Sequence, residues 1–178
     1  PDVQLFCPTV KEEIVFGPLQ LGCPKNTIQE RLGKLCSVLN LCGLLDRAPH
    51  QLSIGEKRKV ALAAVLISEP QILILDEPTV GLDPLTTRVI IDLLMQENNS
   101  GRTIITATHD LHIVEEVSER VYVFSQQKAI VKTGPAADII DDSRLLEENN
   151  LIHIHAHRHQ GQFHAHPHPH SHSGHHAD

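Results

Sequence analysis

One short apolar run, residues 71–76, constrains the fold of this chain more than any other segment. It reads Gln-Ile-Leu-Ile-Leu-Asp and is bounded by Pro70 and Pro78. Its length and its lack of alternation are typical of a strand buried on both faces of a parallel sheet. Helical patterns stand on either side of it, at residues 55–68 and 85–97. The chain is therefore expected to contain an α/β core.

The alternation of strands and helices continues downstream of this run. The β-branched stretch 102–108 and the apolar stretch 121–124 are expected to be strands, with a helix at residues 110–119 between them. Residues 129–132 are a candidate for a fourth strand, and two short helices are expected within residues 136–149. The β-α-β-α-β order predicts an α/β parallel sheet.

The first fifty residues are expected to be mainly helical. Pro8 and Thr9, followed by two acids, are typical of a helix start, and Gly17-Pro18 is typical of its end. Apolar residues then recur near helical spacing over residues 24–41.

Two carboxylates, Asp76 and Glu77, close the apolar run. In doubly wound sheets, ligands bind at the carboxyl ends of the strands. One acid at this place can hold Mg²⁺, and a second can orient an attacking water. A solvated acidic turn would give the same local pattern, so this segment alone is only moderately specific.

Three further segments carry candidate functional residues. Residues 53–56, Ser-Ile-Gly-Glu, open a helix whose free N–H groups and positive end suit an anion, although a simple Ser cap would look the same. Residues 81–84, Gly-Leu-Asp-Pro, form a turn just before the next helix. His109 follows the next strand, where a histidine alone would be structural as readily as functional.

In their order and spacing, these segments resemble the ATP-binding domain of ABC transporters. Residues 53–56 resemble the signature motif, and residues 75–78, Leu-Asp-Glu-Pro, resemble the Walker B motif with its catalytic glutamate. Residues 81–83 resemble the D-loop, and His109 resembles the switch histidine. The resemblance implies a P-loop NTPase fold with a parallel sheet core.

The same resemblance implies a domain organisation. Residues 1–151 would form the ATPase domain, incomplete at the N-terminus, with a helical subdomain at about 1–50 and a catalytic core at 51–135. C-terminal helices would occupy residues 136–151, and residues 152–178 would form a histidine-rich tail.

Roles for the first group of site residues follow from the resemblance. Asp76 would help to hold the Mg²⁺ that accompanies ATP. Glu77 would act as the general base toward the attacking water, and His109 would contact the γ-phosphate.

A second group would act between two subunits. Such ATPases work as head-to-tail dimers that enclose two ATP molecules. Ser53 and Gly55, with Glu56 of the same motif, would bind the γ-phosphate of a nucleotide held by the partner, and Asp83 would couple the two sites. Homodimer and heterodimer both remain open.

Two departures from the family pattern stand out. Ile54 occupies the third signature position, which is usually Gly, and this is interpreted as tuning rather than loss. No G-x-x-x-x-G-K-[ST] phosphate-binding loop occurs in the 178 residues. Truncation and gene degeneration are both open explanations, and in either case the chain by itself is not expected to hydrolyse ATP.

The composition changes sharply at His153. Eleven of the 26 residues from there to the end are histidine, and almost no apolar residue remains, so a disordered tail is expected. Neutral imidazole suits Ni²⁺, Co²⁺, Zn²⁺ and Cu²⁺. A solvated low-complexity tail and an expression tag are the alternatives. The candidate metal ligands are His153, His155, His157, His159, His164, His166, His168, His170, His172, His175 and His176.

The transporter type is indicated by the N-terminal segments. Residues 1–6, 8–10 and 16–18, together with residues 53–63, resemble the ATPases of energy-coupling-factor importers. With the tail, this implies a subunit that powers nickel or cobalt uptake, bound to transmembrane subunits at the cytoplasmic face of the cell membrane. The helical subdomain would grip a coupling helix of the membrane partner. A vitamin importer ATPase and a metal-buffering or chaperone protein with a degenerate ATPase domain are the alternatives.

Composition argues against other classes. The formal net charge of −7 disfavours nucleic acid as the main partner. No segment reaches the roughly 18 apolar residues of a membrane span, and no basic n-region indicates an export signal. The four cysteines, Cys7, Cys23, Cys36 and Cys42, are expected to be reduced thiols, with metal ligation by the last two left open.

Overall fold

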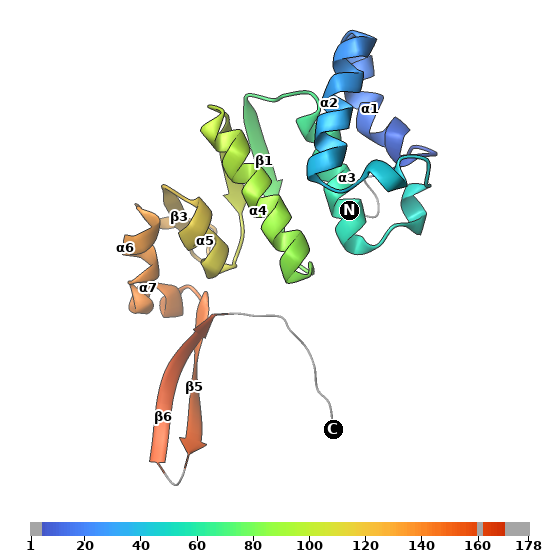
Figure 1. Ribbon diagram of the computed structural model, residues 1–178. Helices are drawn as coiled ribbons and strands as arrows, with labels where there is room; N and C mark the ends of the chain where they lie inside the picture. The colour runs from blue at the N-terminus through green and yellow to red at the C-terminus, as the bar shows by residue number, and fades with distance from the viewer. Residues whose placement is uncertain (1–4, 160–161, 170–178) are drawn as a thin grey trace. The chain divides into compact units, whose positions relative to one another are not determined.

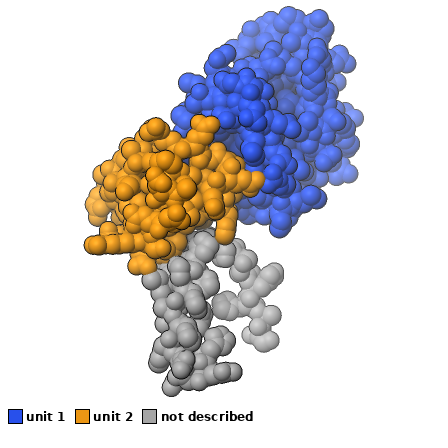
Figure 2. Space-filling view, turned by 60° about the vertical axis from the view of Figure 1, so that its left-hand side comes forward, with its two compact units in different colours: residues 1–106 blue, residues 107–178 orange. Residues whose placement is uncertain are grey.

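The computed structural model describes residues 5–159 and 162–169, and it describes side chains for residues 5–152. The chain divides into two compact units, Pro1–Thr106 and Ala107–Asp178 (Figure 2). Each unit has an apolar core of its own. The predicted tail domain would instead begin at residue 152, where the composition changes, and this separate domain stays a prediction.

Unit 1 begins with helices and continues into a β-α-β arrangement (Figure 1). None of the helices within the described ranges is both long and apolar enough to cross a bilayer. The elements are α1 (Val10–Gln20), α2 (Lys25–Val38), the 3₁₀ turns η1 (Cys42–Leu44) and η2 (Pro49–Gln51), α3 (Ile54–Leu66), β1 (Ile72–Asp76), α4 (Pro84–Asn99) and β2 (Thr103–Ala107), whose last residue falls at the unit boundary.

The helical character predicted for the first fifty residues is confirmed, but the end of α1 is not where Gly17-Pro18 would put it. Thr9 caps the helix as predicted, with Oγ1 accepting from the Glu12 N–H at 3.2 Å. The helix then continues through Pro18, and its last turn is closed by the Leu21 N–H, which donates to the Gly17 carbonyl at 3.1 Å. Proline removes one helical donor, and here that loss does not end the helix.

The strands β1 and β2 are hydrogen-bonded neighbours that are joined through α4. A helical crossover is the connection that parallel neighbours need. This arrangement agrees with the α/β class expected from the sequence.

The prediction that β1 is buried on both faces is wrong for the described residues. Leu73 is 2% exposed and packs into the core of unit 1, whereas Ile72 and Ile74 are 58% and 74% exposed. Ile105 on β2 is also exposed, while its neighbour Ile104 packs against the core. A parallel sheet is normally covered on both faces, and the described chain covers only one.

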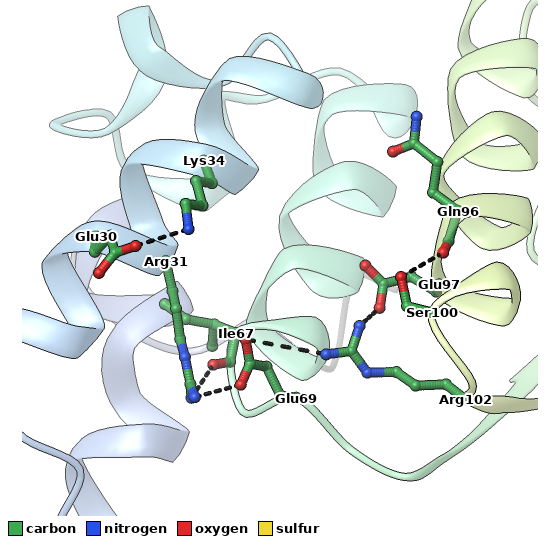
Figure 3. Close-up of polar contacts among 9 residues, drawn as sticks. All are labelled: Glu30, Arg31, Lys34, Ile67, Glu69, Gln96, Glu97, Ser100 and Arg102. Atoms are coloured by element: carbon green, nitrogen blue, oxygen red, sulfur yellow. Dashed lines mark hydrogen bonds and ion pairs between the residues drawn. The ribbon is translucent and has the colours of Figure 1, made fainter.

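A network of charged side chains connects α2 to the segments that flank β1 and β2 (Figure 3). Arg31 pairs with Glu69 and donates to the Ile67 carbonyl at 3.2 Å. Arg102 lies 4.0 Å from Glu69 and pairs with Glu97 at the end of α4. The half-buried guanidinium groups therefore tie the helical region to the residues that lead into the sheet.

Unit 2 contains short helices, an antiparallel strand pair and the hairpin of the tail (Figure 1). Its core consists of Val123, Ile139, Leu146 and Ile152. Its elements are α5 (Leu111–Val117), β3 (Val121–Phe124), β4 (Ile130–Gly134), α6 (Ala136–Ile140), α7 (Ser143–Glu148), β5 (Ile152–His159) and β6 (Gln162–Pro169).

The strand β3 is present where it was predicted, but its pairing differs from the prediction. It pairs antiparallel with β4, with Val121 opposite Gly134, in a two-stranded sheet separate from β1 and β2. Only a short turn separates the two strands, and a turn of that length favours antiparallel pairing over a crossover.

Part of the histidine-rich tail forms a two-stranded backbone ribbon. The backbones of β5 and β6 pair antiparallel, with His153 opposite His168 and His157 opposite His164. A two-stranded ribbon is at best marginally stable by itself in water, so this pairing is compatible with the tail that was predicted to lack a core of its own. The candidate ligands nearest the C-terminus, His170, His172, His175 and His176, lie outside the described residues.

Two leucines that cap helix C-termini offer a matched test of the core of unit 1. Leu39 follows α2 and is 0% exposed, whereas Leu21 follows α1 and is 73% exposed. We expect Leu39→Ala to lower the free energy of unfolding by about 2–5 kcal/mol because it leaves a cavity. Leu21→Ala should change it by less than about 0.5 kcal/mol. Urea unfolding measures both, and equal losses would contradict the assigned core.

Candidate functional site

The start of α3 is fixed by a capping box that involves two of the predicted site residues. Ser53 Oγ accepts from the Glu56 N–H at 3.3 Å, and the Glu56 carboxylate accepts from the Ser53 N–H at 2.8 Å. The hydrogen bond from the Ser53 backbone, followed by the one from its side chain, lowers the pKa of Glu56 below its ordinary value. Glu56 is therefore stabilised as a carboxylate, and it accepts a hydrogen bond at the start of α3.

This cap leaves several donors at the helix start. The Ser53 hydroxyl is engaged in the cap, because it accepts from the Glu56 N–H and its hydrogen bond to the Glu56 carboxylate helps to lower the pKa of Glu56. The N–H groups of Ile54 and Gly55 lie in the first turn, where a helix provides no acceptor. Ser53 and Ile54 are exposed. Together with the positive end of the helix dipole, these donors suit a phosphate oxygen.

The start of α4 is capped in a similar way by Asp83. One carboxylate oxygen accepts from the Thr86 N–H at 2.9 Å, and the other accepts from the Thr86 hydroxyl at 2.7 Å. The hydroxyl bond is the main cause that lowers the pKa of Asp83. Gly81 precedes the cap with a φ of 74°, a left-handed conformation that suits glycine. In this chain, Asp83 therefore has a capping role, and its coupling role across a dimer stays a prediction.

The two capped helix ends lie against each other. A Cβ built on Gly55 would lie 3.5 Å from the Thr86 methyl carbon and 3.9 Å from Leu82. From the next turn of α3, Arg58 approaches the Val80 carbonyl at 3.5 Å. The structure thus brings Ser53, Gly55 and Glu56 next to the turn that carries Asp83.

The two acids of the Walker B segment sit at the carboxyl end of β1, as predicted. Asp76 is the last residue of the strand and is exposed. Glu77 is half-buried and has a φ of 45°, which is uncommon for a residue with a side chain. Pro78 and Thr79 are buried and anchor the turn that follows. Left-handed residues of this kind cluster at functional sites.

The residues around Asp76 fit a Mg²⁺ that comes with a nucleotide. Among the described residues, no group of three or more acidic, histidine or cysteine side chains could hold a metal ion by itself. Mg²⁺ in phosphoryl-transfer sites needs only one or two carboxylates, with phosphates and waters completing its coordination. The exposed Asp76 carboxylate can supply one such oxygen.

His109 belongs to unit 2, where it lies half-buried between β2 and α5. Asp110 caps α5 by accepting from the His112 N–H at 3.1 Å. The Asp110 N–H in turn donates to Thr108 Oγ1 at 3.1 Å. These bonds fix the backbone on either side of His109. The predicted nucleotide-site residues are thus found in both units, with His109 in unit 2 and Ser53, Gly55, Glu56, Asp76, Glu77 and Asp83 in unit 1.

Two residues of the site were missed by the sequence interpretation. Thr86 joins Asp83 to Gly55, and Arg58 joins α3 to the turn after β1. A signal for Thr86 was present, because a hydroxyl residue three positions after an Asp-Pro helix start is a common capping arrangement. No local pattern predicts the contact of Arg58, which lies 22 positions from Val80.

The capping box predicts a pH dependence that Glu56→Gln removes. Because the folded-state pKa of Glu56 lies below its ordinary value of 4.5, its carboxylate stabilises the fold above that value and loses this effect as the pH falls through the folded-state pKa. The difference in unfolding free energy between the native chain and the variant should be larger at about pH 7 than at about pH 3.

Urea unfolding across this range measures the difference. Glu147→Gln, at an exposed position in α7, serves as the control and should give a smaller change with pH. A constant difference between native chain and Glu56→Gln at all pH values would contradict the assigned bonds.

Known proteins match the chain over most of its length. It is 40% identical over 151 residues to the energy-coupling factor transporter ATP-binding protein EcfA of Methanothermobacter thermautotrophicus, covering 85% of the chain and 48% of that protein. It is 45% identical over 155 residues to the nickel import ATP-binding protein NikO of Rhodobacter capsulatus, covering 85% and 61%. The chain thus spans about half to three fifths of the length of these curated relatives.

A solved structure and a family model also match. The structure of cbiO1 from Clostridium perfringens, part of the ABC transporter complex cbiONQ, has a TM-score of 0.69 at 36% identity and covers 85% of this chain and 60% of that one. A family model described as AAA domain, AbiEii toxin, type IV TA system matches residues 43–115. The predicted α/β fold of the ABC ATPases is confirmed by these matches. Over 85% of its length, the chain is similar to ATP-binding proteins of ABC transporters.

Proposed function

We propose that this chain is the larger part of an ATPase subunit that powers nickel or cobalt import by an energy-coupling-factor type ABC transporter. The observation that carries the ATPase part of the proposal is the packing of Gly55 beside Thr86, so that the segment that resembles the signature motif lies next to the Asp83 turn. The names of the relatives, one of them a nickel import protein and another a transporter ATP-binding protein, support the substrate class.

Hydrolysis of ATP requires a base and a fixed position for the attacking water. Glu77 lies directly after β1 and would accept the proton of that water. Asp76 would hold the Mg²⁺ that neutralises the phosphate charge. His109, at the end of β2, would donate to the γ-phosphate.

The signature helix would act on a nucleotide held by another subunit. The N–H groups of Ile54 and Gly55, with Ser53 beside them, would bind the γ-phosphate as a helix-end anion site. Asp83 would couple the two sites, because its turn contacts the start of α3 through Thr86. A dimer of ATPase subunits, either homomeric or heteromeric, is therefore part of the proposal.

The proposal requires a phosphate-binding loop from outside these 178 residues, since they contain no G-x-x-x-x-G-K-[ST]. The uncovered face of β1 and β2, with Ile72, Ile74 and Ile105 exposed, supports this view, because a further segment would cover it. A degenerate ATPase with a metal-buffering tail is the alternative that the absent loop favours. A vitamin importer ATPase is the second alternative.

The partner surface is proposed to be a groove of about 580 Å³ in the helical region. Its lining is apolar apart from Lys11, Lys25 and Gln29, and it would take a cytoplasmic helix of the transmembrane subunits. The proposal includes a position at the cytoplasmic face of the membrane and expects no nucleic acid partner. The apolar walls are Val15, Leu19, Ile28, Leu32, Gly33, Cys36, Cys42 and Leu45.

Glu77→Gln tests the motor function in the full-length subunit with its membrane partners. Glutamine keeps the size of the side chain but cannot take the proton, so we expect ATP hydrolysis to fall by about 10²–10⁴-fold. Nucleotide binding should persist, and release of phosphate measures the rate.

The control is Glu12→Gln, at an exposed position in the first turn of α1, which should leave hydrolysis unchanged. An unaltered rate in Glu77→Gln would remove Glu77 as the base. No hydrolysis even by the native full-length subunit would favour the degenerate alternative.

The tail predicts binding of Ni²⁺ that depends on pH. Imidazole binds metal in its neutral form, so affinity should fall steeply below the ordinary histidine pKa of about 6.5. Isothermal titration of the chain with Ni²⁺ at about pH 7.5 and about pH 5.5 measures this loss. A variant in which every tail histidine is changed to Asn is the control. If that variant binds Ni²⁺ as tightly as the native chain, the tail is not the metal site.

A further inference from the structure

Two cysteines lie at one end of the groove because of the way α2 ends. The helix stops at Val38, and the chain reverses through Asn40, whose φ of 56° is left-handed. The Leu41 N–H donates back to the Cys36 carbonyl at 2.8 Å, which is a typical bond of such a helix end. Cys42, the first residue of η1, follows immediately and so lies against the last turn that carries Cys36.

The two thiols share this groove but differ in access to solvent. Cys36 is 1% exposed and Cys42 is exposed, and both line the groove as free thiols. Burial, and secondly the charge of Cys42, raise the pKa of Cys36 to about 11. The pair therefore consists of one sulfur that solutes can reach and a second, in the last turn of α2, that they cannot.

We propose that Cys36 and Cys42 form a dithiol that hydrogen peroxide converts into an intramolecular disulfide at this end of the groove. The Cys42 thiolate first attacks one oxygen of the peroxide, the O–O bond breaks, and the leaving hydroxide takes up the thiol proton as water. The product is a sulfenic acid on Cys42. Cys36 sulfur then attacks the Cys42 sulfur, the S–O bond breaks, and a second water leaves. The two thiols lose two electrons in total, and the peroxide gains them.

The order of these steps follows from exposure. Cys42 is the accessible sulfur, so it meets the peroxide, and the buried Cys36 meets only the sulfur beside it. Among the described residues, the other two cysteines, Cys7 and Cys23, do not line the groove. The bond would tie η1 to α2 and change one wall of the groove. The chemistry does not depend on the proposed ATPase function.

Tryptic peptides of the intact chain separate the outcomes. Cleavage after Lys34 and Arg47 puts both cysteines into one peptide, residues 35–47, whereas Cys7 and Cys23 fall into peptides 1–11 and 12–25. The protein is treated with hydrogen peroxide, unfolded, alkylated and digested with trypsin, and the peptide masses are measured by mass spectrometry. We expect peptide 35–47 to carry no alkyl group and to be two hydrogens lighter than the unalkylated dithiol peptide, and to take up two alkyl groups when dithiothreitol is added before alkylation. Peptides 1–11 and 12–25 should remain alkylated.

Cys42→Ser is the matched variant, because it changes an exposed side chain and should not disturb the core. In this variant, Cys36 should remain fully alkylated after peroxide. In the native chain, the rate of closure after Cys42 has been oxidised should rise about 10-fold per pH unit between neutral pH and the pKa of Cys36, because only its thiolate attacks. Peroxide that drives Cys42 to the sulfinic acid while Cys36 stays alkylated would overturn the proposal. Disulfides that join peptide 35–47 to another peptide would overturn it as well.

Discussion

The contact between Gly55 and Thr86 is the interaction on which the candidate site depends. Thr86 satisfies both oxygens of Asp83 with its N–H and hydroxyl, and its methyl group lies nearest to Gly55. One buried side chain therefore orders the cap of α4 and the position of the start of α3. The distances leave ordinary van der Waals space at Gly55, so within this chain the helix ends pack without strain. The exposed groups at the starts of α3 and α4, N–H donors on one and the Asp83 carboxylate on the other, therefore lie close together.

A second constraint links this site to the helical region. Glu69 has a φ of 50° and lies three residues before β1, between Arg31 from α2 and Arg102 from the start of β2. Exposed ion pairs contribute little stability each, but this set joins three elements at one place. Other residues of α2 line the groove, so these ion pairs connect the groove to the segment that leads into β1, the strand that ends in Asp76.

The sequence could predict features that have a local cause. The apolar run before Asp76, the cap at Ser53 and the helix start at Thr9 are all decided by a few neighbouring residues, and each is found where it was expected. Features set by distant parts of the chain could not be predicted. The open face of β1 depends on what covers the sheet, and the pairing of β3 with β4 depends on which partner is near. The motif order identified the family, while the contact of Arg58 with Val80 needed the fold.

The central claim is that the starts of α3 and α4 form a surface that receives a nucleotide held by a second subunit. Sedimentation velocity of the full-length Glu77→Gln subunit, with and without ATP and Mg²⁺, tests it most directly, because the variant should bind ATP without consuming it. The account predicts that ATP shifts the subunit to a dimer, and that adding Ser53→Glu abolishes the shift, since a carboxylate at the helix start repels phosphate. An association state that ATP does not change, or a shift that survives Ser53→Glu, would contradict it.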